Sequence, residues 1–239
     1  MPLMWGWVLV QAREVQSYPV PTDSPRVRLP GGDPLRVLVF GSGPAVGRGV
    51  TSHTLSLPGA LARTLSARSG RAIEVDLVSE GWMTAAIASR RLSAMDLSGY
   101  DAIVVFVGVD DALTLVSLRR WARSLSAMLS ALFSTASPSA RAYVVGIQPI
   151  RSIPVFDSRL GALADRHAVE LNALTEEECA RWPRADFVRF READPAPTLR
   201  FRDAPAYLRI AQLLASAMRP QLAGEFAENV VENTDPRGS

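Results

Sequence analysis

The chain has 239 residues, a formal net charge of +2 and 48% hydrophobic residues, which suits one large α/β domain with a substantial core. All 26 lysine-or-arginine positions hold arginine, so Schiff-base chemistry and a Walker-type phosphate lysine are excluded. The near-neutral charge provides no basic field for nucleic acid. A single cysteine, Cys179, cannot form an internal disulfide or a thiolate metal site, and we expect a reducing, cytoplasmic location.

The first ten residues, MPLMWGWVLV, are apolar. A membrane span needs about 20 such residues, and neither the basic start nor the small-residue cleavage site of a secretory signal is evident. We therefore expect no transmembrane segment, and residues 1–34 are predicted to form an arm that packs on the domain. Contact of residues 1–10 with a membrane surface is the alternative, because two tryptophans and two methionines lie there.

Beyond an irregular lead-in over residues 15–34, short apolar runs alternate with stretches of helical periodicity. Strict alternation of this kind predicts right-handed crossovers and a parallel sheet covered on both faces. We expect a three-layer αβα, flavodoxin-like domain over residues 35–220, with about five strands in the order 2-1-3-4-5, and a flexible polar tail over residues 221–239. The predicted strands are 35–40, 72–78, 102–107, 142–147 and 186–190, and the predicted helices begin near 58 or span 83–92, 112–134, 158–174 and 205–218.

Functional residues of such sheets gather in the loops beyond the carboxyl ends of the strands. The loop after the first predicted strand lies in RVLVFGSGPAVGRGV, which resembles the first block of the SGNH (GDSL-type) serine hydrolases. In that family the strand ends in Gly-Asp/Glu-Ser. Gly41 and Gly47 keep the family glycines, whereas Ser42 falls on the acidic position and Gly43 falls on the nucleophilic serine.

The other family blocks follow in order. The Asn-Gly pair after the second strand is Glu80-Gly81 here, and Gly-x-Asn-Asp after the third strand is GVDD, with Asp110 in place of the asparagine and Asp111 kept. These four residues, with Ser42 and Gly43, form the ligand pocket that the resemblance implies.

The last block of the family is Asp-x-x-His-Pro, followed by a tyrosine and an amphipathic helix. Tyr207 and its helix match the second half, and counting back without a gap puts Thr198 on the aspartate and Phe201 on the histidine. A gapped version pairs Asp203 with the aspartate and deletes the histidine segment.

The resemblance covers roughly residues 35–218 and implies an esterase-like fold with degenerate catalytic blocks. Esterase chemistry needs a hydroxyl, a histidine base and an orienting carboxylate, and the former triad positions Gly43, Thr198 and Phe201 provide none of them. We therefore predict a non-catalytic binding or scaffolding protein without a cofactor, whose partner is a small molecule or a protein. The runner-up is an active esterase or acyltransferase in which Ser42 pairs with His53 and with Asp110 or Asp111.

Two further alternatives remain open. The turn Gly41-x-Gly43-x-x-x-Gly47 resembles a dinucleotide-binding loop, although Pro44 removes one amide and no helix follows directly. The carboxylates of Glu80, Asp110 and Asp111 could instead hold a divalent cation.

The sequence also makes an electrostatic prediction. Glu80 and Asp110 replace neutral donors in neighbouring loops, so their carboxylates are expected to lie within several ångströms of each other and to raise at least one pKa. Arg48 is a candidate to neutralise them. His167 lies on an apolar helix stripe and is predicted to be a structural, partly buried histidine.

Overall fold

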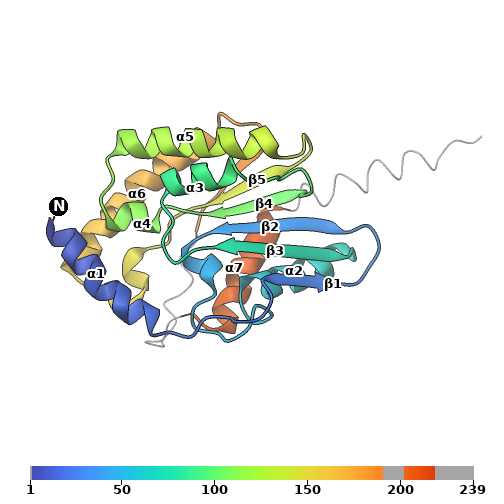
Figure 1. Cartoon of the computed structure of the whole chain (residues 1–239), viewed down its shortest axis with the longest axis horizontal. Coiled ribbons are helices and arrows are strands. Elements are labelled where there is room, and N and C mark those ends of the chain that lie inside the picture. Colours follow the sequence, from blue (N-terminus) through green and yellow to red (C-terminus); the bar gives the residue numbers. More distant parts are fainter. Residues whose placement is uncertain (1, 191–201, 219–239) are drawn as a thin grey trace, which may run out of the picture.

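The computed structural model describes residues 2–190 and 202–218 and has a three-layer α/β architecture around one six-stranded sheet (Figure 1). The strand order is β1-β3-β2-β4-β5-β6, and every neighbouring pair except β1–β3 is parallel. The five parallel strands confirm the predicted order 2-1-3-4-5. The strands are β1 (Arg26–Leu29), β2 (Leu35–Gly41), β3 (Ile73–Ser79), β4 (Ala102–Phe106), β5 (Arg141–Val145) and β6 (Ala185–Val188).

Helices cover both faces of this sheet (Figure 1). The α-helices are α1 (Pro2–Gln16), α2 (Leu57–Ser69), α3 (Ala85–Leu92), α4 (Val109–Leu113), α5 (Leu118–Thr135), α6 (Arg159–Cys179) and α7 (Ala204–Ala217), and the 3-10 turns are η1 (Gly43–Val46), η2 (Ile150–Ser152) and η3 (Pro154–Phe156).

The central strands are buried on both sides, as parallel strands between two helical layers must be. Because successive side chains alternate, Leu38 and Phe40 of β2 enter the core beneath α3, α5 and α6, whereas Val37 and Val39 enter the core beneath α2 and α7. The sheet thus separates two apolar cores.

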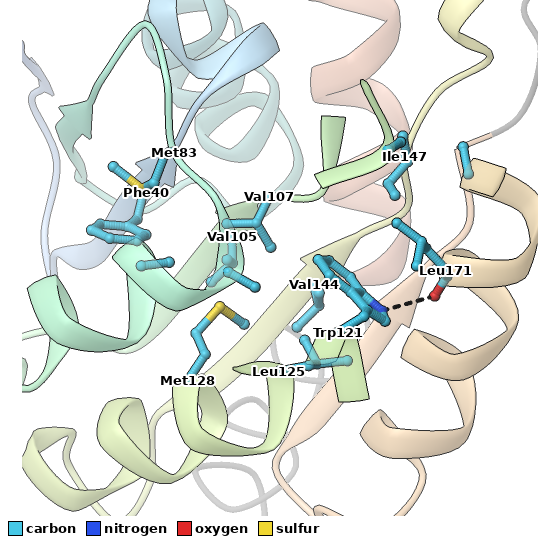
Figure 2. Close-up of a cluster of buried hydrophobic side chains, with 14 of the residues drawn as sticks. Phe40, Met83, Val105, Val107, Trp121, Leu125, Met128, Val144, Ile147 and Leu171 are labelled. Atoms are coloured by element: carbon cyan, nitrogen blue, oxygen red, sulfur yellow. Dashed lines mark hydrogen bonds between the residues drawn. The ribbon is translucent and has the colours of Figure 1, made fainter. Parts of the chain in front are cut away.

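Trp121 lies at the centre of the first core (Figure 2). Its side chain is fully buried, and its indole nitrogen donates to the carbonyl of Leu171 (3.1 Å) and to the hydroxyl of Thr175 (3.3 Å). The large apolar surface is therefore buried without an unsatisfied indole donor.

The predicted continuous helix over residues 112–134 is wrong, because two helices occupy this stretch. α4 ends where Leu115 adopts a positive φ of 51°, and the Ser117 side chain then accepts from the amide of Arg120 to cap α5. The break lets α4 lie directly at the end of β4, which is where the site residues of the GVDD segment are placed.

The segment preceding the parallel sheet is more ordered than an irregular lead-in. Residues Arg26–Leu29 add the antiparallel edge strand β1 to β3, with alternating half-buried and exposed side chains. α1 packs against η3, where Trp7 contacts the ring of Phe156, and Trp5 contacts the ring of Trp82. Through these contacts α1 lies beside the carboxyl ends of the strands (Figure 1).

The predicted tail over residues 221–239 lies outside the described residues. Within the described part of the chain, no helix combines the length and apolar character that a membrane crossing requires.

Candidate functional site

The candidate site begins at the carboxyl end of β2. Gly41 has a φ of 133°, and a Cβ atom at this position would overlap the carbonyl oxygen of Phe106 on β4. The amide of Ser42 donates to the same carbonyl at 2.9 Å. Only glycine allows the two strand ends to approach this closely, and this approach positions Ser42 against the loop that follows β4.

That loop turns at Gly108, whose φ is 105°, and leads directly into α4. Asp110 in the first turn of α4 points back toward β2. One of its oxygens, Oδ2, accepts from the hydroxyl of Ser42 (3.1 Å) and from the amide of Met83 (2.6 Å). Asp110 therefore ties together the segments that follow β2, β3 and β4.

Asp111 makes a parallel connection, because its Oδ2 accepts from the amide of Ala85 at 3.0 Å. Both carboxyl groups are buried. Burial raises the pKa of Asp110 to about 6, against the opposing effect of its hydrogen bonds from Met83 and Ser42. Burial also raises the pKa of Asp111 to about 6, and the nearby charge of Asp110 adds to that rise.

A narrow cleft adjoins Ser42, with room inside for about one water molecule; its empty volume of about 270 Å³ includes open solvent. Its walls are mostly apolar, with Ser42 and Gln148 as the polar side chains. The lining residues are Ser42, Pro44, Phe106, Val107, Val109, Val145, Gly146, Ile147, Gln148 and Phe190. The walls therefore favour contact with an apolar group over contact with a charged one.

The structure brings together only some of the predicted pocket residues. Ser42, Asp110 and Asp111 share one hydrogen-bonded region, and Gly43 begins η1 beside Val109. Glu80, however, forms an ion pair with Arg91 of α3.

The prediction that repulsion between Glu80 and Asp110 raises a pKa is therefore wrong about the cause of the rise. The pKa of Asp110 rises, as expected, but through burial and not through repulsion by Glu80. Arg48, the predicted neutralising residue, donates to the carbonyl of Val15 at 3.2 Å. Gly81 lies near this guanidinium.

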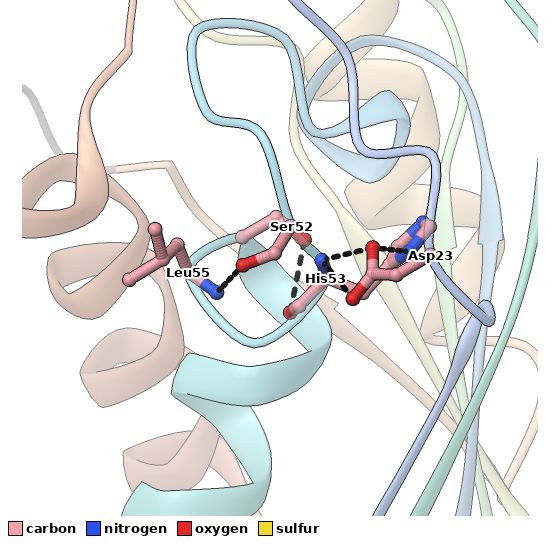
Figure 3. A network of polar contacts seen from close by, with 5 residues as sticks. Asp23, Ser52, His53 and Leu55 are labelled. Atoms are coloured by element: carbon pink, nitrogen blue, oxygen red, sulfur yellow. Dashed lines mark hydrogen bonds and ion pairs between the residues drawn. The ribbon is translucent and has the colours of Figure 1, made fainter.

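His53 is bound to a residue that the sequence did not suggest. Its Nδ1 lies 2.8 Å from Oδ1 of Asp23, and its amide donates to the same carboxylate (Figure 3). Among the hydrogen bonds of the described residues, none joins His53 to Ser42, so the structure does not assemble the hypothesised Ser42–His53 pair.

His167 is also engaged elsewhere. Its Nε2 lies 2.7 Å from the carbonyl oxygen of Val116, and its Nδ1 lies 3.5 Å from a carboxylate oxygen of Glu170. This is the partly buried, satisfied environment expected for a structural histidine.

The other two residues that the sequence alignment matched to the family triad, Thr198 and Phe201, lie outside the described residues. The residues that follow them are described. Asp203, the alternative match for the family aspartate, caps α7 by accepting from the amide of Ala206 at 2.9 Å. Tyr207 donates its hydroxyl to the carbonyl of Arg48 at 2.8 Å, which fastens α7 to the loop after β2.

The two alternative sites gain no support from this geometry. Residues Gly43–Val46 form a 3-10 turn, and α2 begins only at Leu57, so the glycines do not lead into a helix N-terminus. In the described ranges 2–190 and 202–218, no three His, Cys, Asp or Glu side chains are grouped so as to hold a metal ion.

Sequence reasoning missed Gln148 and Phe190 in the cleft and Asp23 beside His53. The loop at 148–158 follows a strand end, so its position was a usable signal for Gln148. Asp23 carried no comparable signal, because its segment precedes the parallel sheet.

Comparisons with known proteins agree with this architecture. A search of curated proteins finds no match. Among solved structures, TesA is 18% identical, with 77% of this chain and 98% of that chain covered and a TM-score of 0.57. A carbohydrate acetylesterase from Sinorhizobium meliloti is 13% identical, with coverages of 78% and 99% and a TM-score of 0.59. An inhibitor-bound aryl esterase from M. smegmatis is 16% identical, with coverages of 78% and 99% and a TM-score of 0.58.

At these identities the structural matches establish the fold alone. The family model of the GDSL-like lipase/acylhydrolase family, however, matches residues 39–209, which include the end of β2, α4, the cleft and the start of α7. The chain therefore belongs to the GDSL-like lipase/acylhydrolase family.

Proposed function

We propose that this chain is a non-catalytic member of its family that binds a small, mostly apolar ligand, or the apolar side chain of a protein, in the cleft beside Ser42. The observation that carries the proposal is the partner of Ser42. Its hydroxyl donates to the carboxylate of Asp110, while His53 and His167 bind Asp23 and Val116.

The residue types at the former triad positions support the same conclusion. Gly43 has no side chain, and neither Thr198 nor Phe201 can act as a general base. An ionised Asp110 beside the cleft would also repel a developing oxyanion, whereas an amide donor stabilises one by roughly 3 kcal/mol.

The decisive experiment is labelling with a fluorophosphonate probe, together with hydrolysis of a short-chain p-nitrophenyl ester. We expect no stoichiometric labelling and no turnover above buffer, with an active esterase of the same family as the positive control. Rapid labelling that Ser42→Ala abolishes would overturn the proposal.

One observation favours a second candidate, an acyl-transferring enzyme with Ser42 as nucleophile. A carboxylate with a pKa of about 6 accepts the Ser42 hydroxyl proton in a hydrogen bond of 3.1 Å, which is the arrangement of a weak serine–carboxylate dyad. In this case Ser42→Ala and Asp110→Asn would both remove labelling, whereas His53→Ala would not.

A variant that restores the family's catalytic residue types tests whether the cleft descends from a catalytically active one. It combines Gly43→Ser, Thr198→Asp and Phe201→His with Glu80→Asn and Asp110→Asn. A Cβ at Gly43 would meet nothing closer than a methyl group of Val109 at 3.9 Å, although its φ of 59° makes any side chain there strained. Recovered ester hydrolysis would support loss of catalysis by substitution. An inert but folded restored protein would show that the shape of the pocket differs as well.

A further inference from the structure

A groove between α3 and α5 lies in the helical layer that covers the Trp121 core (Figure 1). α3 contributes Ala86 and Ser89 to its lining. α5 contributes Arg120, Arg123, Ser124 and Ala127, which recur at helical spacing on one face. The groove has an empty volume of about 780 Å³ that includes open solvent.

The floor of the groove consists of small side chains. α3 and α5 pack against each other through buried residues such as Ala88, Leu125 and Met128. The residues that line the groove outside this contact are two alanines, two serines and two arginines.

The charge of the groove is positive. Neither α3 nor α5 contains an acidic residue. Within the described part of the chain, no carboxylate lies in ion-pair distance of Arg120 or Arg123; Arg123 reaches only the carbonyl of Arg119, at 3.4 Å. The charge of Arg120 acts to lower the pKa of Asp111, but the Asp111 carboxylate is buried and accepts from the amide of Ala85 instead.

The hydrogen-bonding groups are complementary to an anion. Arg120 lies in the first turn of α5, where the helix dipole favours negative charge. The hydroxyls of Ser89 and Ser124 line the same groove and make no hydrogen bond with another described residue. Guanidinium forks bind phosphate oxygens in pairs.

We propose that the α3–α5 groove binds a phosphate-bearing anion through Arg120 and Arg123, with Ser89 and Ser124 as hydroxyl donors. A phosphate monoester carries a charge of about −1.5 to −2 at neutral pH, which two guanidinium groups balance. Its terminal oxygens also use more donors than a single carboxylate does. The site is separate from the cleft beside Ser42, so the inference does not depend on the proposed function.

Calorimetric titration of the intact protein with inorganic pyrophosphate, at constant ionic strength in chloride buffer, tests the site. We expect saturable binding that weakens about 10-fold in Arg120→Gln and in Arg123→Gln. Arg166→Gln is the matched control, because Arg166 on α6 is exposed and donates its Nε to a carbonyl four residues earlier, as Arg123 does.

A steric variant separates the groove from general surface charge. Ser124→Leu fills the floor and leaves both arginines, so it is expected to weaken binding as strongly as loss of one arginine. Thermal unfolding identifies variants that fold, and the arginine variants carry the test if Ser124→Leu does not fold.

Sedimentation with phosphatidylcholine vesicles that contain phosphatidic acid identifies the source of the phosphate. Binding of pyrophosphate alone indicates a soluble ligand, and vesicle binding that Arg120→Gln and Arg123→Gln abolish indicates a lipid headgroup. The proposal is overturned if neither probe binds saturably, if Arg166→Gln weakens binding as much as the groove variants, or if a folded Ser124→Leu protein binds normally.

Discussion

The strand-end site and the Trp121 core are neighbours with opposite chemistry. Gly108 joins them: a Cβ on this residue would meet the Trp121 ring at 2.9 Å, and Asp110 follows two residues later. The indole ring of Trp121 is buried among apolar side chains, and its N–H group finds two hydrogen-bond acceptors there. Asp110 and Asp111 are buried as carboxyl groups that resist ionisation.

This difference shows that the Trp121 core stabilises the fold, whereas the strand-end site depends on the rest of the fold for its stability. Packing around Trp121 contributes favourable free energy. Burial of two titratable groups opposes folding whenever they are ionised. The core thus holds the strand-end site in an arrangement that its own electrostatics disfavour.

The largest expected effect comes from Trp121→Ala. The cavity and the loss of the indole hydrogen bonds to Leu171 and Thr175 should reduce the free energy of unfolding by about 3–5 kcal/mol. Urea titration measures this loss, and Trp121→Phe, which keeps most of the ring volume, should lose less. Equal stability of the alanine variant and the wild type would show that this cluster does not dominate the core.

Asp110→Asn should have the opposite sign. One asparagine oxygen can still accept from Ser42 and Met83, because both bonds reach the same carboxylate oxygen, and the buried charge disappears. We expect a gain of about 1–3 kcal/mol in the free energy of unfolding at pH 7.5. Glu177→Gln, at an exposed position, is the control for general charge effects. A loss of stability would mean that the charged form is the favoured one.

The gain in the free energy of unfolding that we expect from Asp110→Asn should depend on pH. A folded-state pKa of about 6, above the ordinary aspartate value of 3.8, means that the folded wild type takes up this proton before the unfolded chain does. The contribution of Asp110 to stability therefore rises as pH falls from about 7 to about 4. The difference between variant and wild type, measured by urea titration at several pH values, should shrink over this window. A constant difference would contradict a raised pKa.

Asp23→Asn should have the smallest effect. Asp23 is exposed, and its hydrogen bonds with His53 lower its pKa below the ordinary aspartate value. The contact therefore stabilises the fold above that ordinary value, and its contribution is lost as pH falls through the folded-state pKa. We expect faster amide hydrogen exchange at His53 with little change in the thermal midpoint. His53→Ala is the reciprocal variant, and unchanged exchange in both would show that this contact does not hold the segment.

The parallel core could be predicted from sequence because its signals are local. Each buried strand is a short apolar run, and the glycines at 41 and 108 mark the strand ends. The edge strand β1 was missed because its burial is only partial and prolines flank it. The break before α5 was missed because Leu118, Trp121 and Leu125 continue a helical stripe, while Leu115 and Ser117 act through backbone geometry and capping.

The location of the candidate site could be predicted from the sequence, but the contacts made by its side chains could not. Asp110 lies where the block order placed it, since strand ends of a parallel sheet share one edge. The partners of Glu80 and His53 depend on tertiary contacts with Arg91 and Asp23. The sequence offers several equally plausible partners for Glu80 and for His53, and only the folded structure shows which partner each one contacts.

The position of α1 also has a consequence for biosynthesis. Trp7 leaves the ribosome before the ring that it contacts, because Phe156 follows roughly 150 residues later, after most of the sheet has been made. The buried side chains of α1, Met4 and Val8, therefore have no complete docking surface while the nascent chain elongates. Docking of α1 is expected to be a late folding event, and until then its apolar side chains are available to a chaperone.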